Sequence, residues 1–245
     1  MRVVVAGVRG FIGAAAVRAI RAAGCDVVPI GRDEHADGDV LVWAAGNRES
    51  PRETHVDAAL AAAVGIHRVI YLSTAEVYGD APLPWHEDGP TLGTSPYAQH
   101  KLAAEQALPA ATILRLGVVY GPGQPPGMVL ASVAYALATD QHVALTAGDQ
   151  TRDFVYVDDV ADAIVAALVA QPAIINVASG VETRVRDAVE LLAGGPDPHL
   201  GFGERVMREG EPRRYVLDVT RAGQLLGWHA TTPLAEGLAR LRVTS

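Results

Sequence analysis

The chain contains 245 residues, of which 20 are Lys or Arg and 28 are Asp or Glu, so its formal net charge is −8. Hydrophobic residues make up 49% of the chain, which excludes an intrinsically disordered protein and predicts a sizeable core. The acidic balance gives no general reason to expect a nucleic-acid partner, and the sequence lacks both the apolar run of a membrane span and the cleavage site of a signal peptide. Because Cys25 has no second cysteine to pair with, we expect a reducing, cytoplasmic location.

Short apolar runs alternate with helical patterns along the first half of the chain. We expect strands at residues 3–5, 27–30, 40–45, 69–73 and 112–116, and helices at residues 11–23, 52–64 and 95–107. This alternation predicts a parallel, doubly wound sheet with helices on both faces. Clusters of Gly and Pro at residues 121–127 and 194–201 indicate loops of a smaller lobe in the second half.

A glycine motif follows the first expected strand directly and opens the first expected helix. Its glycines are Gly7, Gly10 and Gly13, in the spacing GxxGxxG. Glycine allows the backbone to turn sharply and to approach a pyrophosphate, which then binds the free N–H groups at the helix start. A bare glycine pattern is a weak signal, but this position between a Val run and an Ala-rich helix predicts a dinucleotide site.

The end of the second expected strand bears on which dinucleotide binds. An acidic residue that holds the ribose diol of NAD is usual at this place, but the sequence has Gly31 there, followed by Arg32. An arginine can form charge-assisted bonds to the 2′-phosphate of NADP, and Arg9 in the glycine motif lies near enough to help. We therefore expect NADP(H) rather than NAD(H). The Asp33 carboxylate would instead favour NAD(H), and both arginines could be solvated surface residues without a role in binding.

A second constellation joins Thr74, at the end of the fourth expected strand, with Tyr97 and Lys101 on the following helix. Residues four apart on a helix share one face, and an ammonium beside a phenol favours the phenolate. Lys101 is the only lysine in a chain whose other basic residues are all arginine. The pair is therefore interpreted as a general acid or base with its activating cation, and the Thr74 hydroxyl can bind the same substrate oxygen.

The motifs together resemble an extended short-chain dehydrogenase/reductase of the NAD-dependent epimerase/dehydratase family, whose members mostly act on nucleotide sugars. The resemblance runs nearly end to end, through GVRGFIG, VIYLSTAEVYGD, SPYAQHKLAAE, LRLGVVYGPGQ, RDFVYVDDVADAI, INVASG and LLGW. It implies a Rossmann-like core made of residues 1–117 and 153–178, with a discontinuous substrate lobe made of residues 118–152 and 179–245. It also implies a homodimer formed through the helices at residues 52–64 and 95–107.

The resemblance carries site residues onto this sequence by position. Thr74, Tyr97 and Lys101 take the catalytic places. The cofactor would contact Gly7, Arg9, Gly10, Phe11, Ile12, Gly13, Arg32, Ala44, Ala45, Gly46, Leu72, Tyr97, Lys101 and Gly117. The substrate would contact Thr74, Glu76, Gln124, Arg152 and Arg213, with Arg214 as the alternative to Arg213. No His, Cys and Asp spacing resembles a metal site, so we expect none.

Two departures from the family pattern affect these expectations. Only about six residues separate Arg32 from Asp39, where the family inserts a helix and a strand, so an edge strand of the sheet is expected to be missing. Asp37 or Asp39 could then replace the aspartate of the family's loop. Ala75 stands where the sugar 4,6-dehydratases of the family carry an acid, and a residue without a proton cannot perform that step, so 4,6-dehydration is disfavoured.

These observations favour an NADP(H)-dependent ketoreductase acting on a nucleotide-linked keto sugar, such as a 4-keto-6-deoxyhexose. A nucleotide-sugar 4-epimerase with tightly bound NAD is the alternative. Reduction of a non-sugar ketone and a non-catalytic dinucleotide sensor also stay open, because a fold does not determine its function.

Overall fold

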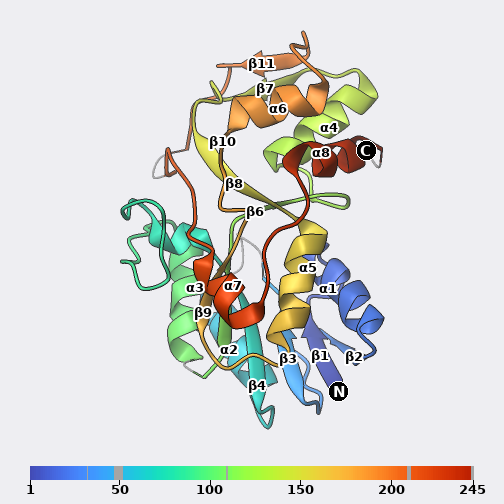
Figure 1. Cartoon of the computed structure of the whole chain (residues 1–245), viewed down its shortest axis with the longest axis vertical. Helices are drawn as coiled ribbons and strands as arrows, with labels where there is room; N and C mark the ends of the chain where they lie inside the picture. Colours follow the sequence, from blue (N-terminus) through green and yellow to red (C-terminus); the bar gives the residue numbers. More distant parts are fainter. Residues whose placement is uncertain (32, 47–51, 109, 209–210, 244–245) are drawn as a thin grey trace.

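The computed structural model describes residues 1–31, 33–46, 52–108, 110–208 and 211–243, and its largest element is a six-stranded sheet in which all strands run parallel (Figure 1). In spatial order the strands are β2 (Asp26–Ile30), β1 (Arg2–Ala6), β3 (Val40–Trp43), β4 (Arg68–Thr74), β5 (Thr112–Leu116) and β9 (Ile174–Val177). The predicted fold class, a doubly wound parallel sheet, is therefore confirmed.

Helices cover both faces of this sheet because its strands are apolar on both sides. Successive residues of β1 point to opposite faces: Val3 and Val5 belong to one hydrophobic cluster, and Val4 and Ala6 to another. The first cluster includes residues of α1 (Phe11–Ala22) and α5 (Val157–Ala167), which pack together, and the second includes residues of α2 (Arg52–Ala63) and α3 (Pro96–Ala107), which also pack together. The carboxyl ends of the strands thus open onto loops held between two helical layers.

β2 forms the outer edge of the sheet, as the short connection after it predicts. In the part of the chain that the structure describes, no strand pairs with the outer side of β2. Residues 33–39 lead to the amino end of β3, and there Asp39 accepts a hydrogen bond from the backbone N–H of Arg2 at 2.7 Å. The expectation that Asp39 could serve the cofactor site is therefore wrong, because nucleotides bind at the carboxyl edge.

The remaining elements lie mostly beyond the carboxyl edge of the sheet, in the upper part of Figure 1. They comprise a three-stranded sheet of β10 (Glu182–Arg184), β8 (Thr151–Tyr156) and β6 (Val118–Tyr120), a pair of β11 (Leu200–Phe202) and β7 (Val143–Leu145), and the helices α4 (Val129–Thr139), α6 (Val185–Ala193) and α8 (Leu234–Val243). α7 (Thr220–Leu226) packs instead on α5 and β9. The exact boundaries between core and lobe stay a prediction. None of the described helices is long and apolar enough to cross a bilayer.

Candidate active site

The glycine motif forms a tight turn between β1 and α1 in which side chains have no room. Gly7 has a φ of 84°, a left-handed conformation that favours glycine, and its carbonyl oxygen accepts a hydrogen bond from Gly10 N at 2.9 Å. A Cβ atom at Gly13 would lie 2.1 Å from that same oxygen. A Cβ atom at Gly7 would lie 2.6 Å from the carbonyl oxygen of Ala44, so the turn after β3 closes against the glycine turn. This backbone is shaped to approach another backbone or a pyrophosphate closely.

The start of α1 supplies donors for an anion. No side chain caps the helix at Gly10, and its first turn holds no acidic residue. No carboxylate of α1 itself therefore neutralises the positive end of the helix, and its backbone N–H groups can bind an anion. Arg9 is exposed in the turn, and Phe11 and Ile12 are half-buried behind it. Ala45 is buried and Gly46 is exposed, with a φ of 125°, in the neighbouring turn. This geometry is compatible with a dinucleotide, as the sequence predicts.

The end of β2 differs from its sequence-based description. Arg32 lies outside the described residues, so its contact with a cofactor stays a prediction. The Glu34 side chain folds back, and its Oε2 accepts a hydrogen bond from Gly31 N at 2.6 Å. A carboxylate therefore lies beside Gly31, although the residue at the strand end carries none. Glu34 was not among the expected cofactor residues, although a carboxylate three residues after the strand end can reach back across a turn.

The end of β4 and the start of α3 bring the predicted catalytic residues together. Thr74 is the last residue of β4, and its Oγ1 accepts a hydrogen bond from Glu76 N at 3.2 Å, which begins a short 3-10 helix, η1 (Ala75–Tyr78). α3 packs on both β4 and η1, and it begins where Ser95 Oγ accepts a hydrogen bond from Ala98 N at 3.1 Å. Tyr97 is half-buried in the first turn of α3.

Lys101 is buried one turn after Tyr97. Its Nζ donates a hydrogen bond to the backbone oxygen of Leu72 at 2.7 Å, and it lies 5.9 Å from the ring centroid of Tyr97 and 4.9 Å from that of Tyr71. Burial lowers the pKa of Lys101 to about 8, against the opposing influence of the Glu105 carboxylate. An ammonium beside two aromatic rings, with a pKa close to neutrality, is suited to tune a phenol.

Glu105, one further turn along α3, is the buried anion of this region. It accepts a hydrogen bond from Ser73 Oγ, and Arg115 Nη2 donates to its Oε2 at 2.7 Å. The Glu105 and Arg115 side chains are only 4% and 3% exposed. Lys101 and Glu105 therefore attach α3 to two successive residues of β4, Leu72 and Ser73. Glu105 was not among the expected site residues, although its place four residues after Lys101, on the same helix face, could have indicated it.

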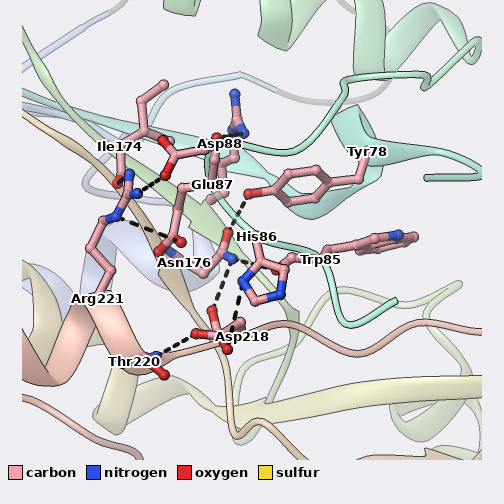
Figure 2. Close-up of polar contacts among 11 residues, drawn as sticks. Tyr78, Trp85, His86, Glu87, Asp88, Ile174, Asn176, Asp218, Thr220 and Arg221 are labelled. Atoms are coloured by element: carbon pink, nitrogen blue, oxygen red, sulfur yellow. Dashed lines mark hydrogen bonds and ion pairs between the residues drawn. The ribbon is translucent and has the colours of Figure 1, made fainter. Parts of the chain in front are cut away.

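Tyr78 lies near this site, but its phenol belongs to a structural network (Figure 2). Its hydroxyl donates to Asn176 Oδ1 at 2.6 Å, and the Asn176 amide donates in turn to the backbone oxygens of Trp85 at 2.8 Å and Asp218 at 3.0 Å. Glu87 Oε1 accepts from Asn176 N at 2.9 Å. Burial is the main cause that raises the pKa of Tyr78 to about 12. Of these two tyrosines, Tyr97 is the one placed beside the lysine.

Arg221 closes the same network from α7. Its Nε lies 3.8 Å from Glu87 Oε2, its Nη2 donates to the Asp88 carboxylate, and its Nη1 donates to the backbone oxygen of Ile174 at 3.3 Å (Figure 2). These contacts tie the loop before α3 and the C-terminal segment to β9. The network thus holds the surroundings of α3 in place.

Two predicted substrate residues, Glu76 and Arg152, are electrostatic neighbours of Tyr215, which is buried. Burial raises the pKa of Tyr215, and the neighbouring Glu76 raises it further. The same phenol interacts electrostatically with Arg152 and Tyr97, and the Arg152 guanidinium lies 5.7 Å from its ring centroid. Arg152 itself forms an ion pair with Glu211, a partner that the sequence did not indicate.

The other predicted contacts are distributed more widely. Gln124 donates to the backbone oxygen of Val119 at 3.1 Å, and its Oε1 is buried without a hydrogen-bond partner among the described residues. Arg213 is exposed, and Arg214 is paired with Glu182 at 2.6 Å. Gly117 lies at the carboxyl end of β5, where a Cβ atom would be 2.9 Å from the carbonyl oxygen of Asp153. Their contacts with a cofactor or substrate stay predictions.

Comparison with known proteins gives a consistent result. A model described as "NAD dependent epimerase/dehydratase family" matches residues 52–178, more than half of the chain. UDP-glucose 4-epimerase of Mycolicibacterium smegmatis is 36% identical over 72% of this chain and 61% of its own length. GDP-6-deoxy-D-mannose reductase of Pseudomonas aeruginosa is 32% identical over 69% of this chain and 62% of its own length. The chain thus spans about three fifths of both relatives. A solved structure of MoeE5 in complex with UDP-glucose and NAD is similar with a TM-score of 0.86 at 27% identity, covering 100% of this chain and 98% of that one.

Proposed function

The chain belongs to the NAD-dependent epimerase/dehydratase family, and from this premise we propose that it moves a hydride between a nicotinamide cofactor and a sugar carbon of a nucleotide sugar. The observation that carries the proposal is the position of Lys101, which is buried beside Tyr97 and bonded to the backbone oxygen of Leu72. The glycine turn supports a site for a dinucleotide, because Cβ atoms at Gly7 and Gly13 would collide with neighbouring backbone atoms. The family resemblance drawn from the sequence motifs is confirmed by the match.

Each catalytic residue then has one task. Tyr97 delivers a proton to the substrate oxygen when the carbonyl is reduced, and it removes that proton when the alcohol is oxidised. Lys101 favours the phenolate through its charge, and Thr74 donates a hydrogen bond to the same oxygen. A bound nicotinamide would supply or accept the hydride. The cofactor would rest on Gly7, Gly10 and Gly13 at the start of α1.

The direction of net reaction separates two candidates. The ketoreductase was the first expectation because a net reductase draws on NADPH, and Gly31, Arg9 and Arg32 favour that cofactor. The Glu34 carboxylate beside Gly31 weakens this reason. We therefore place the nucleotide-sugar 4-epimerase first, supported by the UDP-glucose 4-epimerase relative. The ketoreductase of a nucleotide-linked 4-keto-6-deoxyhexose is the second candidate, supported by the GDP-6-deoxy-D-mannose reductase relative.

The candidates differ in cofactor consumption. The purified protein is incubated with UDP-glucose in the presence of NAD+, and separately with a dTDP-linked 4-keto-6-deoxyhexose in the presence of NADH or NADPH. A 4-epimerase interconverts UDP-glucose and UDP-galactose without net change in absorbance at the reduced-nicotinamide band. A ketoreductase consumes reduced cofactor in proportion to the keto sugar. If neither substrate reacts and neither nucleotide binds, the proposed function is wrong.

A further inference from the structure

The most informative feature outside the catalytic residues is the Glu34 carboxylate at the end of β2. Its Oε2 lies 2.6 Å from Gly31 N. A Cβ atom at Gly31 would lie 3.1 Å from Glu34 Cδ, 3.3 Å from Oε2 and 3.4 Å from Oε1. The carboxylate therefore occupies the space into which the side chain of an acidic residue at position 31 would project. Glu34 places there the chemical group that position 31 itself lacks.

This place borders the glycine turn. β1 and β2 are parallel neighbours with Ala6 opposite Ile30, so the next residues, Gly7 and Gly31, leave the sheet side by side at its carboxyl edge. In dinucleotide-binding folds, an acidic group at the end of the second strand accepts hydrogen bonds from the ribose hydroxyls of NAD. The same negative charge repels the 2′-phosphate of NADP, while Arg9 in the turn would attract it. The two side chains therefore favour opposite cofactors.

We propose that Glu34 selects the cofactor of this protein and makes it prefer NAD(H) over NADP(H). The proposal rests on the proposed function, because it requires a nicotinamide dinucleotide on the glycine turn. A carboxylate accepts bonds from two ribose hydroxyls at once, and an arginine cannot accept any. This preference is the reverse of the one expected from Gly31, Arg9 and Arg32 alone.

A purely structural role for Glu34 makes a different prediction. The hydrogen bond to Gly31 N is typical of a side chain that stabilises a turn, and the amide oxygen of glutamine can accept it equally well. Glu34→Gln therefore keeps the turn and removes only the charge. If Glu34 merely holds the turn, this substitution leaves the cofactor preference unchanged.

The test measures dissociation constants for NADH and NADPH by titration calorimetry in the wild-type protein, Glu34→Gln and Asp26→Asn. Asp26→Asn is the matched control, because it removes the same charge from an exposed residue at the amino end of β2, the opposite end of that strand from Gly31. We expect the wild type to bind NADH at least ~10-fold more tightly than NADPH, the scale of one charge-assisted contact. In Glu34→Gln this ratio should fall by about 10-fold, and in Asp26→Asn it should change less than about 2-fold.

Tighter binding of NADPH by the wild type, or an unchanged ratio in Glu34→Gln, would overturn the inference while leaving the proposed function standing. A ratio that falls equally in both variants would also overturn it, because the effect would then be one of general charge. Binding of neither nucleotide to the wild type would remove the proposed function and the inference with it. Circular dichroism of each variant establishes that it is folded.

Discussion

Lys101 on α3 and Leu72 on β4 are joined by a hydrogen bond of 2.7 Å from the buried ammonium to a backbone carbonyl. Because the acceptor is part of the sheet, the ammonium is held at the carboxyl edge of β4, two residues before Thr74. A guanidinium is wider and planar and cannot take the same place. The bond thus explains how one lysine in an arginine-rich chain can be required at this position.

The first prediction concerns these catalytic residues. Tyr97→Phe should lower kcat by roughly 10²-fold or more through loss of proton transfer, with cofactor affinity nearly unchanged. Lys101→Arg should not restore function although it preserves the charge. Thr74→Val should cost about the free energy of one hydrogen bond, and Thr74→Ser should be tolerated. Steady-state kinetics provides the measurement, on whichever of UDP-glucose and the dTDP-linked 4-keto-6-deoxyhexose the wild type converts. Near-native turnover in both Tyr97→Phe and Lys101→Arg would place the chemistry elsewhere and favour a sensor.

The second prediction concerns pH. With a pKa of about 8, Lys101 loses its proton as the pH rises through that value, so activity should decline above about pH 8. The Glu105 carboxylate raises this pKa, so Glu105→Gln should move the decline to lower pH. Glu236→Gln, an exposed residue on α8, should leave the profile unchanged. An unshifted profile in Glu105→Gln would contradict the coupling.

The third prediction applies the same pKa to stability. Between about pH 8 and pH 10.5 the unfolded chain keeps the Lys101 proton that the folded chain has released. The unfolded state then binds more protons, so the contribution of this group to the free energy of unfolding increases with pH across that window. Urea unfolding of the wild type and Lys101→Met over this range should show a steeper rise in the wild type. Parallel curves would show that Lys101 titrates normally in the folded protein.

The fourth prediction concerns the buried pair of Arg115 and Glu105. Arg115→Met leaves a buried carboxylate without its cation, which should lower the free energy of unfolding by about 3–5 kcal/mol. The double variant Arg115→Met with Glu105→Gln should recover part of that loss. Arg184→Gln, which breaks an exposed ion pair with Asp187, should cost less than about 1 kcal/mol. Similar losses in Arg115→Met and Arg184→Gln would contradict the buried role.

The fifth prediction concerns the glycine turn. Gly13→Ala should weaken dinucleotide binding at least ~10-fold, because its Cβ atom would lie 2.1 Å from a backbone oxygen and α1 must move. Gly10→Ala should have a smaller effect, since its Cβ atom would lie 3.2 Å from the same oxygen and a shift of a few tenths of an ångström suffices. Titration calorimetry with NADH compares them. The reverse order would show that the turn does not bind the pyrophosphate as proposed.

Much of the site could be predicted from the sequence because local patterns determine it. The glycines stand between a Val run and a helical pattern, which predicts a turn between a strand and a helix, and Tyr97 and Lys101 share a helix face through their spacing of four. The short segment between Gly31 and Asp39 leaves no room for another helix and strand, and β2 is indeed the edge of the sheet. These features depend on residues close together in the chain, so helix periodicity, turn conformation and the length of a connection determine their geometry.

The tertiary structure decided where the charged side chains meet. Glu105 pairs with Arg115, which follows on the next strand, and Arg152 pairs with Glu211, which is 59 residues away. Asp39 lies at the amino edge of the sheet because β3 runs parallel to β2, so the chain must return to that edge before β3 begins. The Glu34 side chain bonds back to Gly31 at the carboxyl edge, before this return. A charged group on a flexible side chain pairs with whichever opposite charge the fold brings near it, and the periodicity of the sequence does not indicate which residue that is.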